Sequence, residues 1–148
     1  MQRTNSMVLG LIAIFVLGGS LVLLSCGGGD NTTDIDQSNA AAQLGGKQFT
    51  FSSETDFNVQ VNSILAFNAS ASNFAFVAGG RAVGSMSYGS GACTFTFRTI
   101  ENAFVSGGPA AGLVVTANPC QTDQDNNNNL ILNGAESTSN GPTTVSVP

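Results

Sequence analysis

From Lys47 onward, hydrophobic and polar residues alternate along the chain with a period of two. In the stretch FNVQVNS, the odd positions 57–61 carry Phe, Val and Val, and the even positions 58–62 carry Asn, Gln and Asn. This alternation places the apolar side chains on one face and is typical of a half-buried β-strand. No stretch after residue 46 shows a capped apolar stripe of 3.6-residue period, so the pattern predicts strands.

Short segments of strand-like composition recur, and turn-forming residues such as GG at 79, NP at 118 and NG at 133 separate them. Regularly spaced short strands favour an all-β fold, a small antiparallel β-sandwich or a partly open barrel, over residues 47–148. The further predicted strands are FTF (49–51), ILAFNA (64–69), FAF (74–76), AVGSMSY (82–88), FTF (95–97), NAFVS (102–106), GLVVTA (112–117), LILN (130–133) and TTVSV (143–147).

Three of these strands carry two Phe residues spaced by two positions, and nine of the ten Phe residues of the chain lie in this domain. An exposed set of such rings would form an aromatic platform for sugars or bases. Same-face Phe side chains also bury well, and each burial stabilises the fold by roughly 1.5–3 kcal/mol. We therefore predict that the pairs form a core layer.

The first 25 residues have the pattern of a targeting segment. Arg3 provides a positive charge, and residues 8–24, VLGLIAIFVLGGSLVLL, form an uncharged apolar stretch. The alternative is a transmembrane anchor that stays attached, but the stretch is at the short limit for a membrane span and no basic cluster follows it.

The residues Leu23-Leu24-Ser25-Cys26 resemble the lipobox of bacterial lipoprotein precursors, with Leu at −3 and a small residue at −1. The resemblance covers residues 1–26 only. It implies that residues 1–25 are cleaved and that the Cys26 thiol carries diacylglycerol, with the new amino group often acylated. Gly27 is not the Asp of an inner-membrane retention signal, so the resemblance favours outer-membrane placement.

Residues 26–46 follow as the lipidated cysteine and a linker, GGGDNTTDIDQSNAAAQLGG, with almost no large apolar side chains. Such a composition cannot bury enough surface to offset the entropy of ordering, so we predict a flexible tether. About 20 residues of this kind reach roughly 25 Å on average and about 65 Å when stretched.

Two cysteines, Cys93 and Cys120, remain once Cys26 carries lipid. An even pair in an exported protein predicts a disulfide, here closing a loop of about 28 residues and worth roughly 3–3.5 kcal/mol in the chain-entropy model. The alternatives are a redox pair or a metal site, but neither cysteine has the C-x-x-C neighbour or the His that these usually need.

The charge pattern narrows the possible functions. The chain has 4 Lys and Arg, 9 Asp and Glu and no His, for a formal net charge of −5, so we expect no nucleic-acid partner. Without His, Ser-His-Asp and Cys-His catalysis are excluded, and a Ser-Lys dyad would need Lys47 at the end of the linker. We therefore expect a protein that is not an enzyme, with a small carboxylate hydrolase as a distant alternative.

The stretch TDQDNNNNLILNGAE, residues 122–136, has the composition of a metal loop, with oxygen ligands at alternating positions that suit Ca²⁺. Framed from Asp125, it partly resembles an EF-hand loop, but Leu130 occupies the position where the sharp turn needs Gly. The alternative is a polar hairpin loop, which we favour, because Asn and Asp are common turn residues. The candidate ligands are Asp123, Asp125, Asn127, Asn129 and Glu136.

These observations predict a lipid-anchored cell-envelope protein that acts as a binding or structural module. Its partners would be the membrane, through the N-terminal lipid, and an envelope protein or a glycan. Exposed strand edges would bind protein by β-augmentation, and Asn and Ser side chains would bind glycan. The alternative function is a calcium- or carbohydrate-binding extracytoplasmic module.

Overall fold

The computed structural model describes residues 31–51, 63–101 and 111–148. The predicted signal peptide, Cys26 and the strand predicted at 102–106 lie outside the described residues. The strand predicted at 57–63 also lies outside them, except for Ser63.

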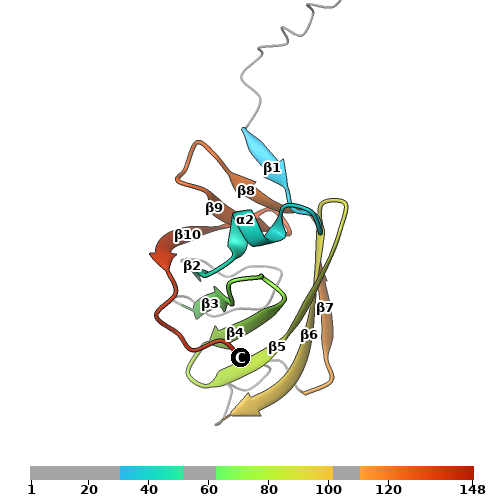
Figure 1. Ribbon diagram of the computed structural model, residues 1–148, viewed down its shortest axis with the longest axis vertical. Coiled ribbons are helices and arrows are strands. Elements are labelled where there is room, and N and C mark those ends of the chain that lie inside the picture. The colour runs from blue at the N-terminus through green and yellow to red at the C-terminus, as the bar shows by residue number, and fades with distance from the viewer. Residues whose placement is uncertain (1–30, 52–62, 102–110) are drawn as a thin grey trace, which may run out of the picture. The chain divides into compact units, whose positions relative to one another are not determined.

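In the described part of the chain, ten antiparallel strands form one sheet, in the order β1-β8-β9-β10-β2-β3-β4-β5-β6-β7 (Figure 1). The one helix in this part is a short segment between β1 and β2. The elements are β1 (Thr32–Asp34), α2 (Ala40–Leu44), β2 (Lys47–Phe51), β3 (Ser63–Phe67), β4 (Asn73–Val77), β5 (Arg81–Gly89), β6 (Ala92–Glu101), β7 (Val114–Ala117), β8 (Cys120–Asp123), β9 (Asn129–Leu132) and β10 (Ala135–Pro142).

Two features show that the sheet curls into a partly open barrel. The first part of β10 pairs with β9 and its later part pairs with β2, with a register shift between Ser139 and Pro142. In addition, β7 lies at one edge of the sheet and β8 lies next to the other edge, yet only Asn118 and Pro119 join them. Such a connection spans about 10 Å at most, so the two ends of the sheet must approach each other. The predicted all-β antiparallel class is confirmed.

The six Phe residues of the three predicted pairs are buried, which confirms the core layer and contradicts the aromatic platform at these positions. The ring of Phe74 makes edge-on contacts with Phe95 and Phe97, with centroids 5.2 and 5.0 Å apart. Phe49 makes a similar contact with Phe67 at 6.1 Å. Edge-on geometry is favourable because the positive edge of one ring meets the negative face of the other.

The predicted disulfide is confirmed, and it also closes the curl. Cys93 on β6 and Cys120 on β8 are both buried and bonded, with their Cα atoms 5.7 Å apart. The backbone N–H of Cys120 donates to the carbonyl of Gly91, and its carbonyl accepts from Ile35. The bridge therefore ties a strand near one edge of the sheet to a strand near the other edge.

The flexible linker predicted through residue 46 is wrong for residues 31–46. These residues form β1 and α2 and belong to the same compact unit as the rest of the sheet. Ile35 and Leu44 are fully buried in the core. Two large apolar side chains, together with the pairing of β1 to β8, are enough to order a segment whose composition is otherwise polar.

Two of the differences from the predicted strands lie at the C-terminal end. Residues 143–147, TTVSV, are not a strand, whereas the polar segment ESTSNGP within β10 is one. β10 forms a strand because β9 and β2 lie on either side of it and pair with it. Its own sequence is too polar to predict a strand. No helix in the described ranges has the length and apolar character needed to cross a membrane.

Candidate functional site

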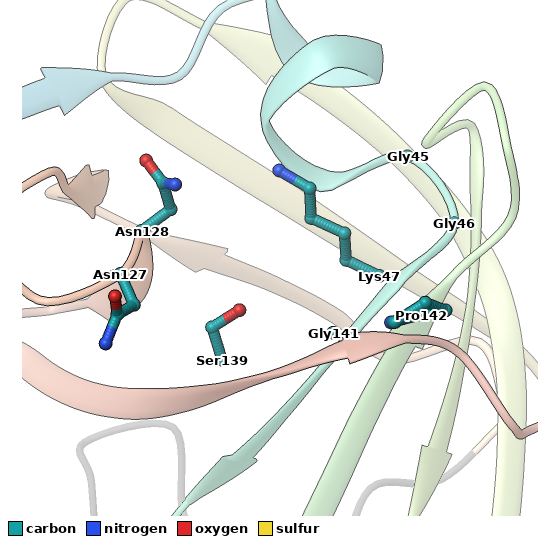
Figure 2. Close-up of a pocket in the computed structure, with 8 residues that line it drawn as sticks. All are labelled: Gly45, Gly46, Lys47, Asn127, Asn128, Ser139, Gly141 and Pro142. Atoms are coloured by element: carbon teal, nitrogen blue, oxygen red, sulfur yellow. The ribbon is translucent and has the colours of Figure 1, made fainter.

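A groove of about 330 Å³ opens where the end of α2, the tip of the β8–β9 hairpin and the later part of β10 meet (Figure 2). Its lining combines one cation, two amides and a hydroxyl with backbone from three glycines. The lining residues are Gly45, Gly46, Lys47, Asn127, Asn128, Ser139, Gly141 and Pro142.

Asp36 organises the chain that leads into α2. Its Oδ1 accepts hydrogen bonds from the Ser38 hydroxyl at 2.6 Å and from the backbone N–H groups of Ser38 and Asn39 at 2.7 and 3.1 Å. These hydrogen bonds, the one from the Ser38 hydroxyl foremost, hold the pKa of Asp36 below its ordinary value. A carboxylate that accepts several N–H groups in this way fixes the turn before the helix.

The exit of α2 requires glycine. A Cβ at Gly45 would lie 2.3 Å from the carbonyl oxygens of both Ala41 and Ala69, so no other residue fits between the helix and that loop. Gly46 has a φ of 66°, in the left-handed region that favours glycine. Together the two glycines turn the chain sharply and bring Lys47 to the edge of the groove.

Lys47 directs its side chain back toward the C-terminal end of α2 (Figure 2). Its Nζ donates to the carbonyl oxygens of Gln43 at 2.8 Å and Ala42 at 3.2 Å. The last carbonyls of a helix lack partners within it and carry partial negative charge, so an ammonium group is favourable there. An ammonium group has three protons, and these two bonds leave one for a further acceptor.

The hairpin tip places two Asn side chains at the groove. The backbone N–H of Asn129 donates to the carbonyl of Asn126 at 3.0 Å, and Asn127 and Asn128 between them have φ values of 56° and 61°. This is a type I′ turn, whose two central residues need positive φ, and Asn tolerates that conformation.

Three polar side chains at the groove are not used in hydrogen bonds to the rest of the described chain. Those of Asn127, Asn128 and Ser139 make no hydrogen bond to any other described residue. Their neighbours in the same loop behave differently: Asp123 accepts from the backbone N–H of Asp125 at 2.9 Å and from the Asn126 amide at 2.6 Å. Asp123 and Asn126 thus stabilise the loop, whereas the side chains of Asn127 and Asn128 are available to bind a ligand.

The predicted calcium ligands are partly committed to these internal bonds. Asp123 holds the turn, and Asn129 donates its amide to Glu136 at 2.7 Å. Asn127 borders the groove, and Asp125 accepts a long 3.5 Å bond from Asn31. Within the described ranges, no three His, Cys, Asp or Glu side chains are grouped so as to hold a metal.

The calcium site therefore stays a prediction. Calorimetric titration of the protein with millimolar Ca²⁺ tests it, and a Glu136→Gln variant should then lose any heat that is observed. Absence of both heat and a thermal shift in the unsubstituted protein would end the idea.

A second exposed feature lies on the edge strand β7, which runs beside β6 (Figure 1). Val114 at the start of β7 is 56% exposed, and Leu113 just before it is 41% exposed. The other large apolar side chains of the described residues are buried or half-buried. No described strand pairs with the outer side of β7. Unpaired backbone groups beside apolar side chains are typical of a strand edge that can accept another strand.

The sequence alone did not predict the groove. It identified the Asn run and Lys47, but favoured a polar hairpin loop for the first, with a calcium loop as the other possibility, and placed the second at the end of a linker. Ser139 carries no local signal, because its place in the groove depends on the pairing of β10 with both β9 and β2. The pair Gly45-Gly46 before a lysine was the one local sign of a special backbone.

No protein-family model, no curated protein and no solved structure matches this chain.

Proposed function

We propose that this chain is a lipid-anchored binding module of the bacterial cell envelope, and that the groove is its ligand site. The lipobox-like residues 23–26 support the anchor, and Gly27 favours the outer membrane. The Cys93–Cys120 disulfide supports export, because such bonds persist in oxidising compartments. Binding without catalysis is the activity we propose.

A short connection to the anchor follows from this proposal. Since β1 begins at Thr32, five residues, 27–31, separate Cys26 from the folded unit. A chain of that length spans about 20 Å at most, far less than the 65 Å expected of the longer linker. An anchor at Cys26 would therefore keep the start of β1 within about 20 Å of the lipid.

The observation that carries the proposal is the set of available polar side chains at the groove. A cavity of this size lies in the usual range for small-ligand sites, in which a few placed polar groups give specificity. Two amides and a hydroxyl provide both donors and acceptors, which match the hydroxyl groups of a saccharide. We therefore propose a glycan of the envelope as the ligand, and no nucleic acid.

The anchor is tested by mass spectrometry of the mature protein isolated from membranes of the native host. We expect an N-terminus at Cys26 that carries diacylglycerol, and a Cys26→Ser variant that fails to be processed. A native protein that retains Met1, or that partitions into buffer without detergent, would contradict the proposal.

The groove is tested by NMR titration of the mature protein with soluble cell-wall and capsular oligosaccharides. Asn127→Gly with Asn128→Gly removes both amides while suiting the positive φ, so the fold should persist and binding should be lost. The control, Ser87→Ala on exposed β5 surface, should bind normally. Binding that survives the double substitution would place the ligand elsewhere.

A second candidate is a protein partner that adds a strand to β7, and exposed Leu113 and Val114 favour it. Crosslinking in whole cells should detect the partner, and Val114→Lys should abolish the crosslink because a charge on the edge blocks strand addition. Ser87→Lys, which adds the same charge on β5, is the matched control. A crosslink that Val114→Lys leaves intact would exclude the β7 edge.

A further inference from the structure

Lys47 is the cation at the groove, and the fold holds it in a defined position. It is half-buried, its Nζ is bound to the carbonyls of Gln43 and Ala42, and it has one proton left. Two bonds from one ammonium to fixed backbone atoms reduce the freedom of a side chain that is otherwise very flexible. A ligand would therefore meet a cation that is already oriented.

Among the residues that the structure describes, no acid compensates this charge. The lining of the groove contains no Asp or Glu, although the chain has nine of these and four Lys and Arg. Among the described residues, Lys47 has no carboxylate partner. The carbonyls that hold the ammonium carry only partial negative charge, so a ligand that brings a full negative charge would gain from meeting it.

The two arginines of the described chain have structural partners instead. Arg81 donates to the carbonyl of Ser146 at 2.5 Å, and Arg98 donates to the Asn73 side chain at 2.6 Å. The first bond joins β5 to the C-terminal segment, and the second joins β6 to β4. Lys47 differs because it lines the groove and its two hydrogen bonds leave one ammonium proton for a further acceptor.

Resting on the proposed function, we infer that the ligand is an acidic saccharide whose carboxylate binds Lys47 while its hydroxyls bind Asn127, Asn128 and Ser139. One ammonium matches the single negative charge of a uronic acid. A phosphate monoester carries close to two charges and would leave one unpaired here. The volume of about 330 Å³ is near the lower end for ligand sites, so the site suits one terminal sugar unit.

The test uses the mature lipidated protein in detergent, titrated by NMR with glucuronate, glucose and glucose 6-phosphate. Glucuronate should bind about tenfold more tightly than glucose, the expected gain for one hydrogen bond between charged groups. Lys47→Gln should remove this preference, so that glucuronate and glucose bind to the variant with similar affinity. The matched control, Arg98→Gln, removes the same charge away from the groove and should keep the preference.

The outcomes separate this inference from the function on which it rests. Equal binding of glucuronate and glucose, or a preference that survives Lys47→Gln, would overturn the carboxylate assignment and leave a glycan site. Tighter binding of glucose 6-phosphate than of glucuronate would also overturn it, in favour of a phosphate site. If the protein keeps its fold by NMR and binds none of these three sugars and none of the oligosaccharides above, both proposals are overturned.

Discussion

Gly84 shows how single residues limit this fold. It lies opposite Phe74 at the irregular point of the β5–β6 pairing. A Cβ there would lie 2.1 Å from the carbonyl oxygen of Thr96 and 2.7 Å from the ring of Phe74. Since Phe74 also contacts the rings of Phe95 and Phe97, the ring cannot withdraw without disturbing the core.

Gly84→Ala should therefore destabilise the protein by about 3 kcal/mol, the upper range for overpacking a core. Denaturant unfolding measures this change. The matched control is Gly89→Ala on the same strand, where a Cβ would meet nothing within 4 Å. The control should change stability by no more than about 0.5 kcal/mol. Equal stabilities of the two variants would contradict the close approach at Gly84.

Asp36 contributes to the stability of the fold in a way that depends on pH, and the direction of this dependence follows from its pKa. Its folded pKa lies below the ordinary value of 3.8, chiefly because it accepts the Ser38 hydroxyl. Its stabilising effect is therefore present above that pH and is lost as the pH falls through the folded pKa. The melting temperature of the native protein should exceed that of Asp36→Ala at pH 6, and the difference should shrink toward pH 2. A difference that is constant with pH would contradict the role of the carboxylate.

At the scale of elements, α2 and β1 matter because they turn a segment of polar composition into part of the core. α2 has only five residues and could not persist alone, since short isolated helices are marginal in water. Buried Leu44 and the carbonyl acceptors for Lys47 both come from this element. The helix thus links the stability of the unit directly to the groove.

Leu44→Ala should cost about 2–5 kcal/mol, as for other fully buried leucines. Leu113→Ala is the matched control, because Leu113 is 41% exposed and the same truncation should have a small effect. Thermal and denaturant unfolding measure both. A neutral Leu44→Ala would mean that residues 31–46 are the flexible linker that their composition suggests.

At the scale of the whole unit, the disulfide decides how firmly the curled sheet is held. Cys93 and Cys120 are 27 residues apart in sequence but join strands near opposite edges of the sheet order. The groove depends on the same curvature, because β10 must pair with both β9 and β2 to bring Ser139 beside the hairpin tip. We therefore expect loss of the bridge to affect both stability and the groove.

Replacing both cysteines, Cys93→Ala with Cys120→Ala, should lower the free energy of unfolding by about 3.5 kcal/mol, the chain-entropy value for a loop of this length. Reductant should lower the melting temperature of the native protein and leave that of the double variant unchanged. A native protein that is insensitive to reductant under partly denaturing conditions would contradict the role of the bridge.

The sequence by itself determined the all-β class, most of the central strands, the buried Phe pairs and the disulfide. These features depend on local alternation, on apolar side chains too large to expose and on the small number of cysteines. The tertiary structure alone decided that residues 31–46 fold, that polar β10 is a strand and that Lys47, Asn128 and Ser139 line the same groove. The reason is that each of these depends on partners distant in the sequence: a segment with few apolar residues becomes ordered only when another part of the chain supplies the surface that it covers.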